Sequence, residues 1–125
     1  MKRDMDLIRQ ILTEIEAKPF DGNMINLDLE DSAGDQKLRY HVILLREAGL
    51  IDAVEPFPGG DSLQTGPIYP TRLTWEGHEF LEAARDDTRW NKAKDTMAKT
   101  GGFVFEVGKA LLIELMKQQL FPAKP

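Results

Sequence analysis

The sequence contains no cysteine, which excludes disulfide scaffolds, thiolate zinc sites and cysteine nucleophiles. This absence is compatible with a reducing compartment, so we expect a cytoplasmic protein. Long hydrophobic runs are also missing. The most apolar segment, residues 103–121, is interrupted by charged residues, and the first residues lack the apolar core of a signal peptide. We therefore expect neither a membrane span nor a membrane partner.

Side chains that commonly carry catalysis are scarce. The two histidines, His41 and His78, lie far apart in the chain, and the only serines, Ser32 and Ser62, have no motif around them. No HExxH zinc motif and no glycine-rich phosphate loop occurs. Both histidines fall on the predicted inner face of a helix, where a hydrogen-bonded structural role is favoured. We expect no enzyme activity, no catalytic residues, no cofactor and no resident metal.

Basic residues are absent from one part of the chain. The net charge is −5, and residues 21–35 hold five acidic residues without a lysine or arginine. This balance argues against indiscriminate affinity for nucleic acid, although it leaves room for a local basic face. Asp28, Glu30 and Asp31 could form a site for a hard metal ion, but their spacing fits no calcium loop, so a solvated loop is favoured.

The apolar residues that are present predict an α+β fold that is mainly α. Residues 4–17 place Ile8, Ile11, Leu12 and Ile15 on one helical face, with Asp4 or Asp6 as the cap. The 125-residue chain is long enough to bury a substantial core. We expect a winged-helix-like domain over residues 1–100 and a C-terminal helix over 101–125.

A second helix is predicted from Asp35, as its cap, to Ala48, with Gly49 as the left-handed residue after its end. Its inner face is expected to hold Leu38, His41, Val42, Leu45 and Ala48. The outer face holds the candidate contact residues for a nucleic acid or a protein partner, which are Gln36, Arg39, Tyr40, Ile43 and Arg46, beside Glu47.

Two strands with a long connection predict a hairpin, or wing. Residues 50–55 and 68–73 have extended character, with Pro70 confined to an edge or a bulge. Arg72 is the only cation near this hairpin and completes the candidate contacts, while the tip carries Asp61, Ser62 and Gln64 and no basic residue. An alternating segment at 25–29 predicts a short strand beside the wing.

Three further helices are expected at 74–84, 88–99 and 103–120. In the first of these, Thr74 is the cap and the inner face carries Trp75, His78, Phe80, Leu81 and Ala84. In the next, Trp90, Ala93 and Met97 are expected to be buried. Cations in 85–99, including Arg85, Arg89, Lys92, Lys94 and Lys99, alternate with acidic residues, so a solvated face is favoured.

The last helix has a broad apolar arc that needs more than one neighbour. It could fold back on its own chain or pair with a second copy, and we expect a homodimer. The predicted dimer seam comprises Val104, Val107, Leu111, Leu112 and Leu115.

Three blocks of the sequence resemble a family of bacterial and phage proteins called domain of unknown function 2513. They are residues 1–9, the stretch from Tyr40 to Ile51, and residues 72–90, which contain Leu73-Thr74-Trp75-Glu76-Gly77. The resemblance covers the chain through about Lys99 and implies a small protein of bacterial or prophage origin. It implies no activity.

A looser similarity links the Glu47-Ala48-Gly49-Leu50-Ile51 ending and the following hairpin to winged-helix transcription regulators. This similarity implies a regulator that binds double-stranded DNA through the helix at 35–48. Those regulators usually have a clear helix in the region matching 21–35, which this sequence lacks. The alternative is a protein-interaction module on the same scaffold, favoured by the acidic balance and by outward-facing Tyr40 and Ile43.

Overall fold

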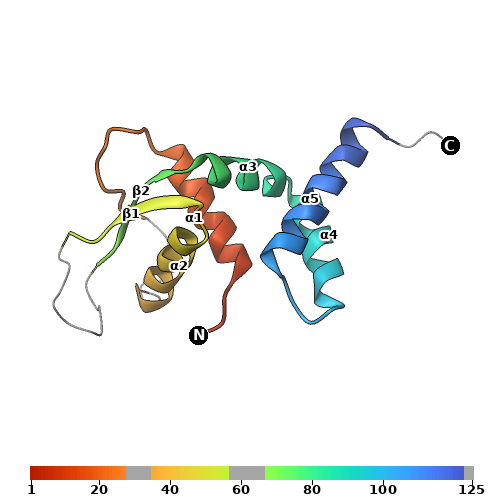
Figure 1. The fold of residues 1–125 in the computed structure, drawn as a ribbon, viewed down its shortest axis with the longest axis horizontal. Helices are drawn as coiled ribbons and strands as arrows, with labels where there is room; N and C mark the ends of the chain where they lie inside the picture. The colour runs from red at the N-terminus through yellow and green to blue at the C-terminus, as the bar shows by residue number, and fades with distance from the viewer. Residues whose placement is uncertain (28–34, 57–66, 123–125) are drawn as a thin grey trace. The chain divides into compact units, whose positions relative to one another are not determined.

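The chain forms five helices and one two-stranded hairpin over the residues that the computed structural model describes, 1–27, 35–56 and 67–122 (Figure 1). The α+β, mainly α class is thereby confirmed. The elements, in order, are α1 (Met5–Ala17), α2 (Asp35–Glu47), β1 (Ile51–Val54), β2 (Tyr69–Leu73), α3 (Trp75–Ala84), α4 (Asp87–Ala98) and α5 (Phe105–Leu120). Two compact units divide the chain, residues 1–78 and 79–125.

Helix α1 forms as its spacing predicts. The carboxylate of Asp4 accepts a hydrogen bond from the Leu7 N–H and so caps the helix. Its apolar face is buried along its whole length, from Met5 through Ile8, Ile11, Leu12 and Ile15. Each buried aliphatic side chain of this size contributes about 1.5–3 kcal/mol to folding, which makes this face a large part of the core of the first unit.

The hairpin pairs β1 with β2 in antiparallel fashion, and Ile51 lies opposite Leu73. Its register shifts between Asp52, opposite Arg72, and Ala53, opposite Pro70. This irregularity agrees with the prediction that Pro70 lies at an edge or a bulge, because proline has no N–H to donate to the ladder. The carbonyl of Pro70 accepts from the Ile25 N–H at 2.8 Å. The strand predicted at 25–29 does not form over its described residues 25–27, which make only this one contact with the hairpin. Residues 28–34 and 57–66 lie outside the described ranges.

The end of α2 and the start of α3 are joined through backbone atoms (Figure 1). Gly49 has a φ of 76°, as predicted for a residue that ends a helix in the left-handed region. The Leu50 carbonyl then accepts from the Thr74 N–H at 3.0 Å. The Thr74 hydroxyl donates to the Gly49 carbonyl and accepts from the Gly77 N–H, which caps α3. We call these four residues, Gly49, Leu50, Thr74 and Gly77, the helix junction.

Within the second unit, α4 and α5 pack on each other around aromatic rings. Trp90 is almost fully buried and lies edge-on to Phe80, while Phe103 stacks against it with ring centroids 5.5 Å apart. Because Phe103 and α5 share this core with α4, the compact unit begins at residue 79. The sequence predicts a boundary at residue 100. That boundary would fall between α4 and α5, which pack on each other in this unit.

Arg89 is buried, contrary to the prediction that it faces solvent. Its guanidinium donates to the carbonyls of Glu82 and Ala83 and to the side-chain oxygen of Gln119. The two carbonyls belong to the last turn of α3, where helix carbonyls lack intrahelical partners and a cation is favoured by the helix dipole. Arg89 therefore caps α3 from within the next helix.

Three residues predicted to face inward are exposed. Trp75 is 76% exposed and His78 is also exposed, so the structural role predicted for His78 is wrong. At about 100° per residue, Trp75 lies on the side of α3 opposite Gly77 and Ala84, which are buried. Ala48 is exposed because α2 ends at Glu47 and the chain turns away there.

No helix among the described residues is both long and apolar enough to cross a membrane.

We predict that Gly77→Ala destabilises the protein, although alanine is normally the better helix former by about 1 kcal/mol. A Cβ at this position would lie 1.9 Å from the Leu50 carbonyl oxygen, which is fixed backbone. We expect a loss of about 2 kcal/mol or more in the free energy of unfolding, as in overpacked cores, measured by urea denaturation. The control is Glu79→Ala, an exposed position on the same helix. Equal stability of the two variants would contradict the close approach.

Candidate nucleic-acid interface

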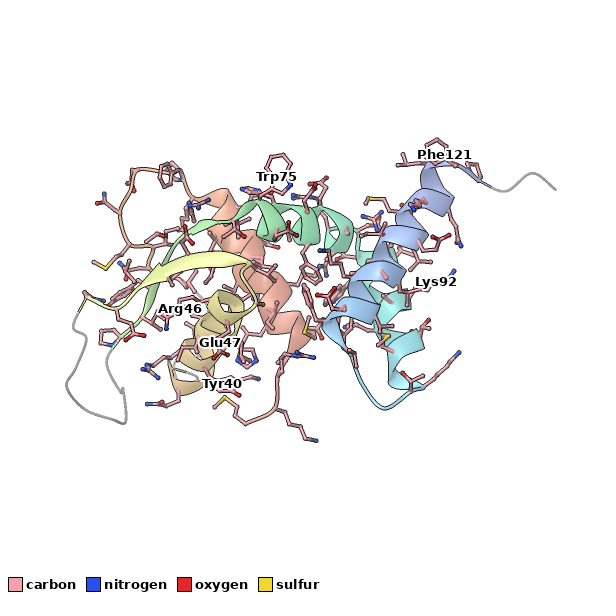
Figure 2. The ribbon with its side chains drawn as sticks, in the orientation of Figure 1. Tyr40, Arg46, Glu47, Trp75, Lys92 and Phe121 are labelled. Atoms are coloured by element: carbon pink, nitrogen blue, oxygen red, sulfur yellow. The ribbon has the colours of Figure 1, made fainter. Side chains whose placement is uncertain are left out.

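The outer face of α2 presents polar and aromatic side chains. Gln36 and Glu47 are exposed, and Tyr40 is 39% exposed (Figure 2). These residues lie on the helix that the sequence singled out, and no described residue buries them. The face combines one amide, one phenol and one carboxylate, so it can both donate and accept hydrogen bonds.

Two of the predicted contact arginines are engaged inside the first unit. Arg46 is half-buried and pairs with Glu55, with 3.0 Å between Nη2 and Oε1. Arg72 pairs with its cross-strand neighbour Asp52 at 2.8 Å and also donates to the Leu73 carbonyl. Arg72 therefore ties β2 to β1, and Arg46 ties α2 to the residue that follows β1. The sequence pattern did not reveal these roles because the partners lie elsewhere in the chain.

Arg39 and Ile43, the remaining predicted contacts on α2, are half-buried. Gln36 and Arg39 line a hollow of about 400 Å³ together with Val42 and the residues at 67–70 that lead into and begin β2. The structure thus brings five of the six candidate residues together on α2, with Arg72 apart from them on β2.

Metal-ligating groups do not gather in the described part of the chain. There, no three histidine, aspartate or glutamate side chains lie close enough together to hold an ion. The acidic residues Asp28, Glu30 and Asp31 lie outside the described ranges.

The segment at residues 1–4 lies against α2, a contact that the sequence analysis missed. The Asp4 N–H donates to Nε2 of the fully buried His41 at 2.8 Å, and Nδ1 of His41 donates to the Lys37 carbonyl at 2.8 Å. Both ring nitrogens of His41 are therefore hydrogen-bonded, as the predicted structural role requires. Its ring also lies edge-on to Tyr40, with centroids 5.9 Å apart.

The carboxylate of Asp4 adds an ion pair to this contact. Lys37 Nζ lies 3.1 Å from Oδ2 of Asp4. Partial burial alone would raise the pKa of Asp4, but the Leu7 N–H and the Lys37 ammonium outweigh it and hold the pKa below its ordinary value of 3.8. Asp4 is therefore ionised at neutral pH, where it caps α1 and binds α2 at once.

The residues of the predicted dimer seam at α5 differ in their burial. Leu112 and Leu115 are buried within the chain itself, so they are not available to a second copy in this conformation. Val104 and Val107 are 56% and 55% exposed, and Leu111 is half-buried. A seam between two copies stays a prediction and would centre on Val104, Val107 and Leu111.

The arrangement defines an α+β protein, mainly α, with a polar helix face beside a hairpin. The chain belongs to the family described as "Hypothetical protein (DUF2513)", which matches residues 2–103, so the resemblance seen in the sequence is confirmed. An "Uncharacterized protein" of Haemophilus influenzae is 37% identical over 97 residues, which cover 78% of this chain and 79% of that protein. No solved structure matches the chain.

We predict that the contribution of Asp4 to stability disappears in acid. Because its pKa is lowered by folding, this contribution is complete above the unfolded value near 3.8 and is lost as pH falls through the folded value below it. Asp4→Asn should therefore be less stable than wild type at pH 7, and the difference should shrink below about pH 3.8, as measured by urea denaturation. Asp21→Asn, at an exposed loop position, is the control. A difference that persists unchanged into acid would contradict this prediction.

Proposed function

We propose that the first unit binds double-stranded DNA as a winged-helix-like transcription regulator, with α2 as its recognition helix. The observation that carries this proposal is the exposed face of α2, which is followed directly by the antiparallel hairpin. The backbone hydrogen bond from Ile25 to Pro70 supports the proposal, because it lies where a winged helix has a short strand beside the hairpin, although Ile25 itself lies outside any strand. The protein would act by binding rather than catalysis, in the bacterial cytoplasm, as the lack of cysteine favours.

The side chains on α2 suit base and phosphate contacts. A major groove admits one α-helix, in which glutamine can bind adenine in bidentate fashion and arginine can bind guanine or phosphate. Gln36 and Tyr40 are exposed for direct contact, and Arg39 lies between them on the helix. Ile43 can supply an apolar contact to a thymine methyl group.

Pairing of two copies through α5 would present two recognition helices to one DNA site. Val104 and Val107 are the exposed apolar residues of the predicted seam. A two-fold dimer of this kind binds a palindromic sequence whose half-sites are about one helical turn apart.

We predict that selection from a random DNA library with the purified protein enriches a palindromic sequence. Gln36→Ala combined with Tyr40→Ala should weaken binding to it by at least about 10-fold, since each base contact contributes about 1–3 kcal/mol. These substitutions leave the Arg46 and Arg72 ion pairs in place. The matched control is Glu47→Ala on the same face, which should bind as tightly as wild type or more tightly because it removes a negative charge.

Two results would overturn the DNA proposal. One is the absence of any enriched sequence from folded protein at both low and high salt. The other is an unchanged affinity in the Gln36 and Tyr40 double variant, with circular dichroism showing that its fold is intact.

The second candidate function is a protein-interaction module. Trp75 favours it, because a largely exposed tryptophan is costly to leave in water and is typical of interface hot spots (Figure 2). In that view Trp75 projects from the start of α3, away from Tyr40. The two exposed aromatic residues define two separate surfaces, of which Tyr40 shares its position with the DNA proposal.

If the module binds a protein, one of these aromatic residues should anchor it. Trp75→Ala or Tyr40→Ala should then abolish capture of a partner from bacterial lysate and weaken binding of the purified partner by roughly 30-fold or more, as for a hot spot. Phe121→Ala is the matched control, since Phe121 is equally exposed but belongs to the second unit. Partner binding that survives both test substitutions would exclude these surfaces.

A further inference from the structure

The segment at residues 1–4 carries two exposed cations to the edge of the recognition face. Lys2 and Arg3 are both exposed and directly precede Asp4, whose N–H and carboxylate are bound to α2. Two residues span at most about 7 Å of chain, so the backbone of Lys2 and Arg3 stays close to His41. The segment is therefore attached to α2 just before its cationic residues.

The same attachment brings the backbone that leads to these cations near Tyr40. His41 accepts from the Asp4 N–H on one side, and its ring lies edge-on to that of Tyr40 at 5.9 Å. Lys37, one turn before His41 on α2, adds a third positive charge that is 39% exposed. We call Lys2, Arg3 and Lys37 the cationic border. It lies at the amino-terminal half of α2, next to the residues of this helix that face outward.

The negative charges of the two acidic residues next to these cations, Asp4 and Asp6, are stabilised within the first unit. The Asp4 carboxylate is engaged by Lys37 and by the Leu7 N–H. Asp6 lies in the first turn of α1, where the helix dipole favours a negative charge. Lys2 and Arg3 precede this point in the chain, and both are exposed.

We propose that Lys2 and Arg3 bind the phosphate backbone of double-stranded DNA beside the groove that α2 enters. This inference rests on the proposed DNA-binding function and extends it to a segment outside the recognition helix. Short basic arms that precede a helical DNA-binding unit reach the minor groove next to the major groove occupied by the helix, and lysine and arginine side chains beside a groove commonly contact phosphates. Here His41 is a positioning residue, because it holds the arm against α2 without touching DNA itself.

The test compares salt dependence of binding between two matched double variants. One is Lys2→Ala with Arg3→Ala, and the other is Lys92→Ala with Lys99→Ala, which removes two exposed charges from α4. Fluorescence anisotropy is measured on a labelled duplex carrying the enriched sequence and on a mixed-sequence duplex, over a series of salt concentrations. Each lost phosphate contact should reduce the slope of log K against log salt by about 0.9.

The expected result is a slope reduced by about 1–2 on both duplexes in the Lys2 and Arg3 variant, with the wild-type slope kept in the Lys92 and Lys99 variant. Wild-type binding with an unchanged slope in the Lys2 and Arg3 variant would overturn this inference alone. Failure of the wild-type protein to bind either duplex would overturn the proposed function, and this inference with it.

A second measurement tests the attachment without DNA. Amide hydrogen exchange at Asp4 should be slower than at Lys2 and Arg3, because only the Asp4 N–H is donated to a buried acceptor. Exchange at Asp4 as fast as in an unstructured peptide would show that the segment is not held on α2, and would overturn the positioning of the arm.

Discussion

Two backbone carbonyls at the end of α2, those of Gly49 and Leu50, fix the arrangement of the first unit. Both accept hydrogen bonds from Thr74, so the chain that leaves α2 for the hairpin must return to the same place. The hairpin satisfies this condition because Ile51 and Leu73, which follow Leu50 and precede Thr74, are paired. Gly77 then lets α3 approach the Leu50 carbonyl more closely than any side chain permits. Packing of α2 against the hairpin follows from this closure.

A second constraint on α2 is polar and comes from the other end of the unit. His41 is fully buried, and its two ring nitrogens are satisfied by the Asp4 N–H and the Lys37 carbonyl. A buried polar atom left without a partner costs about 1–3 kcal/mol, so the 1–4 segment cannot leave α2 without penalty. The helix junction fixes the carboxyl end of α2, and His41 fixes the side that faces α1. The face carrying Gln36 and Tyr40 stays exposed.

Local signals in the sequence were sufficient for most of the fold. The apolar spacing of α1, the left-handed Gly49 and the Thr74 cap each depend on neighbours within a few residues. The prediction that Trp75 faces inward is wrong, because its angular position on α3 is opposite the buried Gly77 and Ala84. The burial of Arg89 depends on where α3 ends, and Asp4 meets His41 only after α1 and α2 pack. Such contacts between distant segments leave no periodic pattern in a sequence.

The ion pairs on the first unit bear on the choice between DNA and protein as the partner. Arg46, Arg72 and Lys37 each face a carboxylate, which lowers the positive potential that the residue types alone suggest. Such pairs at the protein surface, exposed or partly exposed, contribute only about 0–1 kcal/mol, however, because water and salt screen them. A DNA phosphate can therefore compete for these arginines and this lysine at little cost, whereas a hydrophobic partner would have to bury the charges. The ion pairs thus limit non-specific affinity for phosphate without removing the capacity for phosphate contact that the proposed function requires.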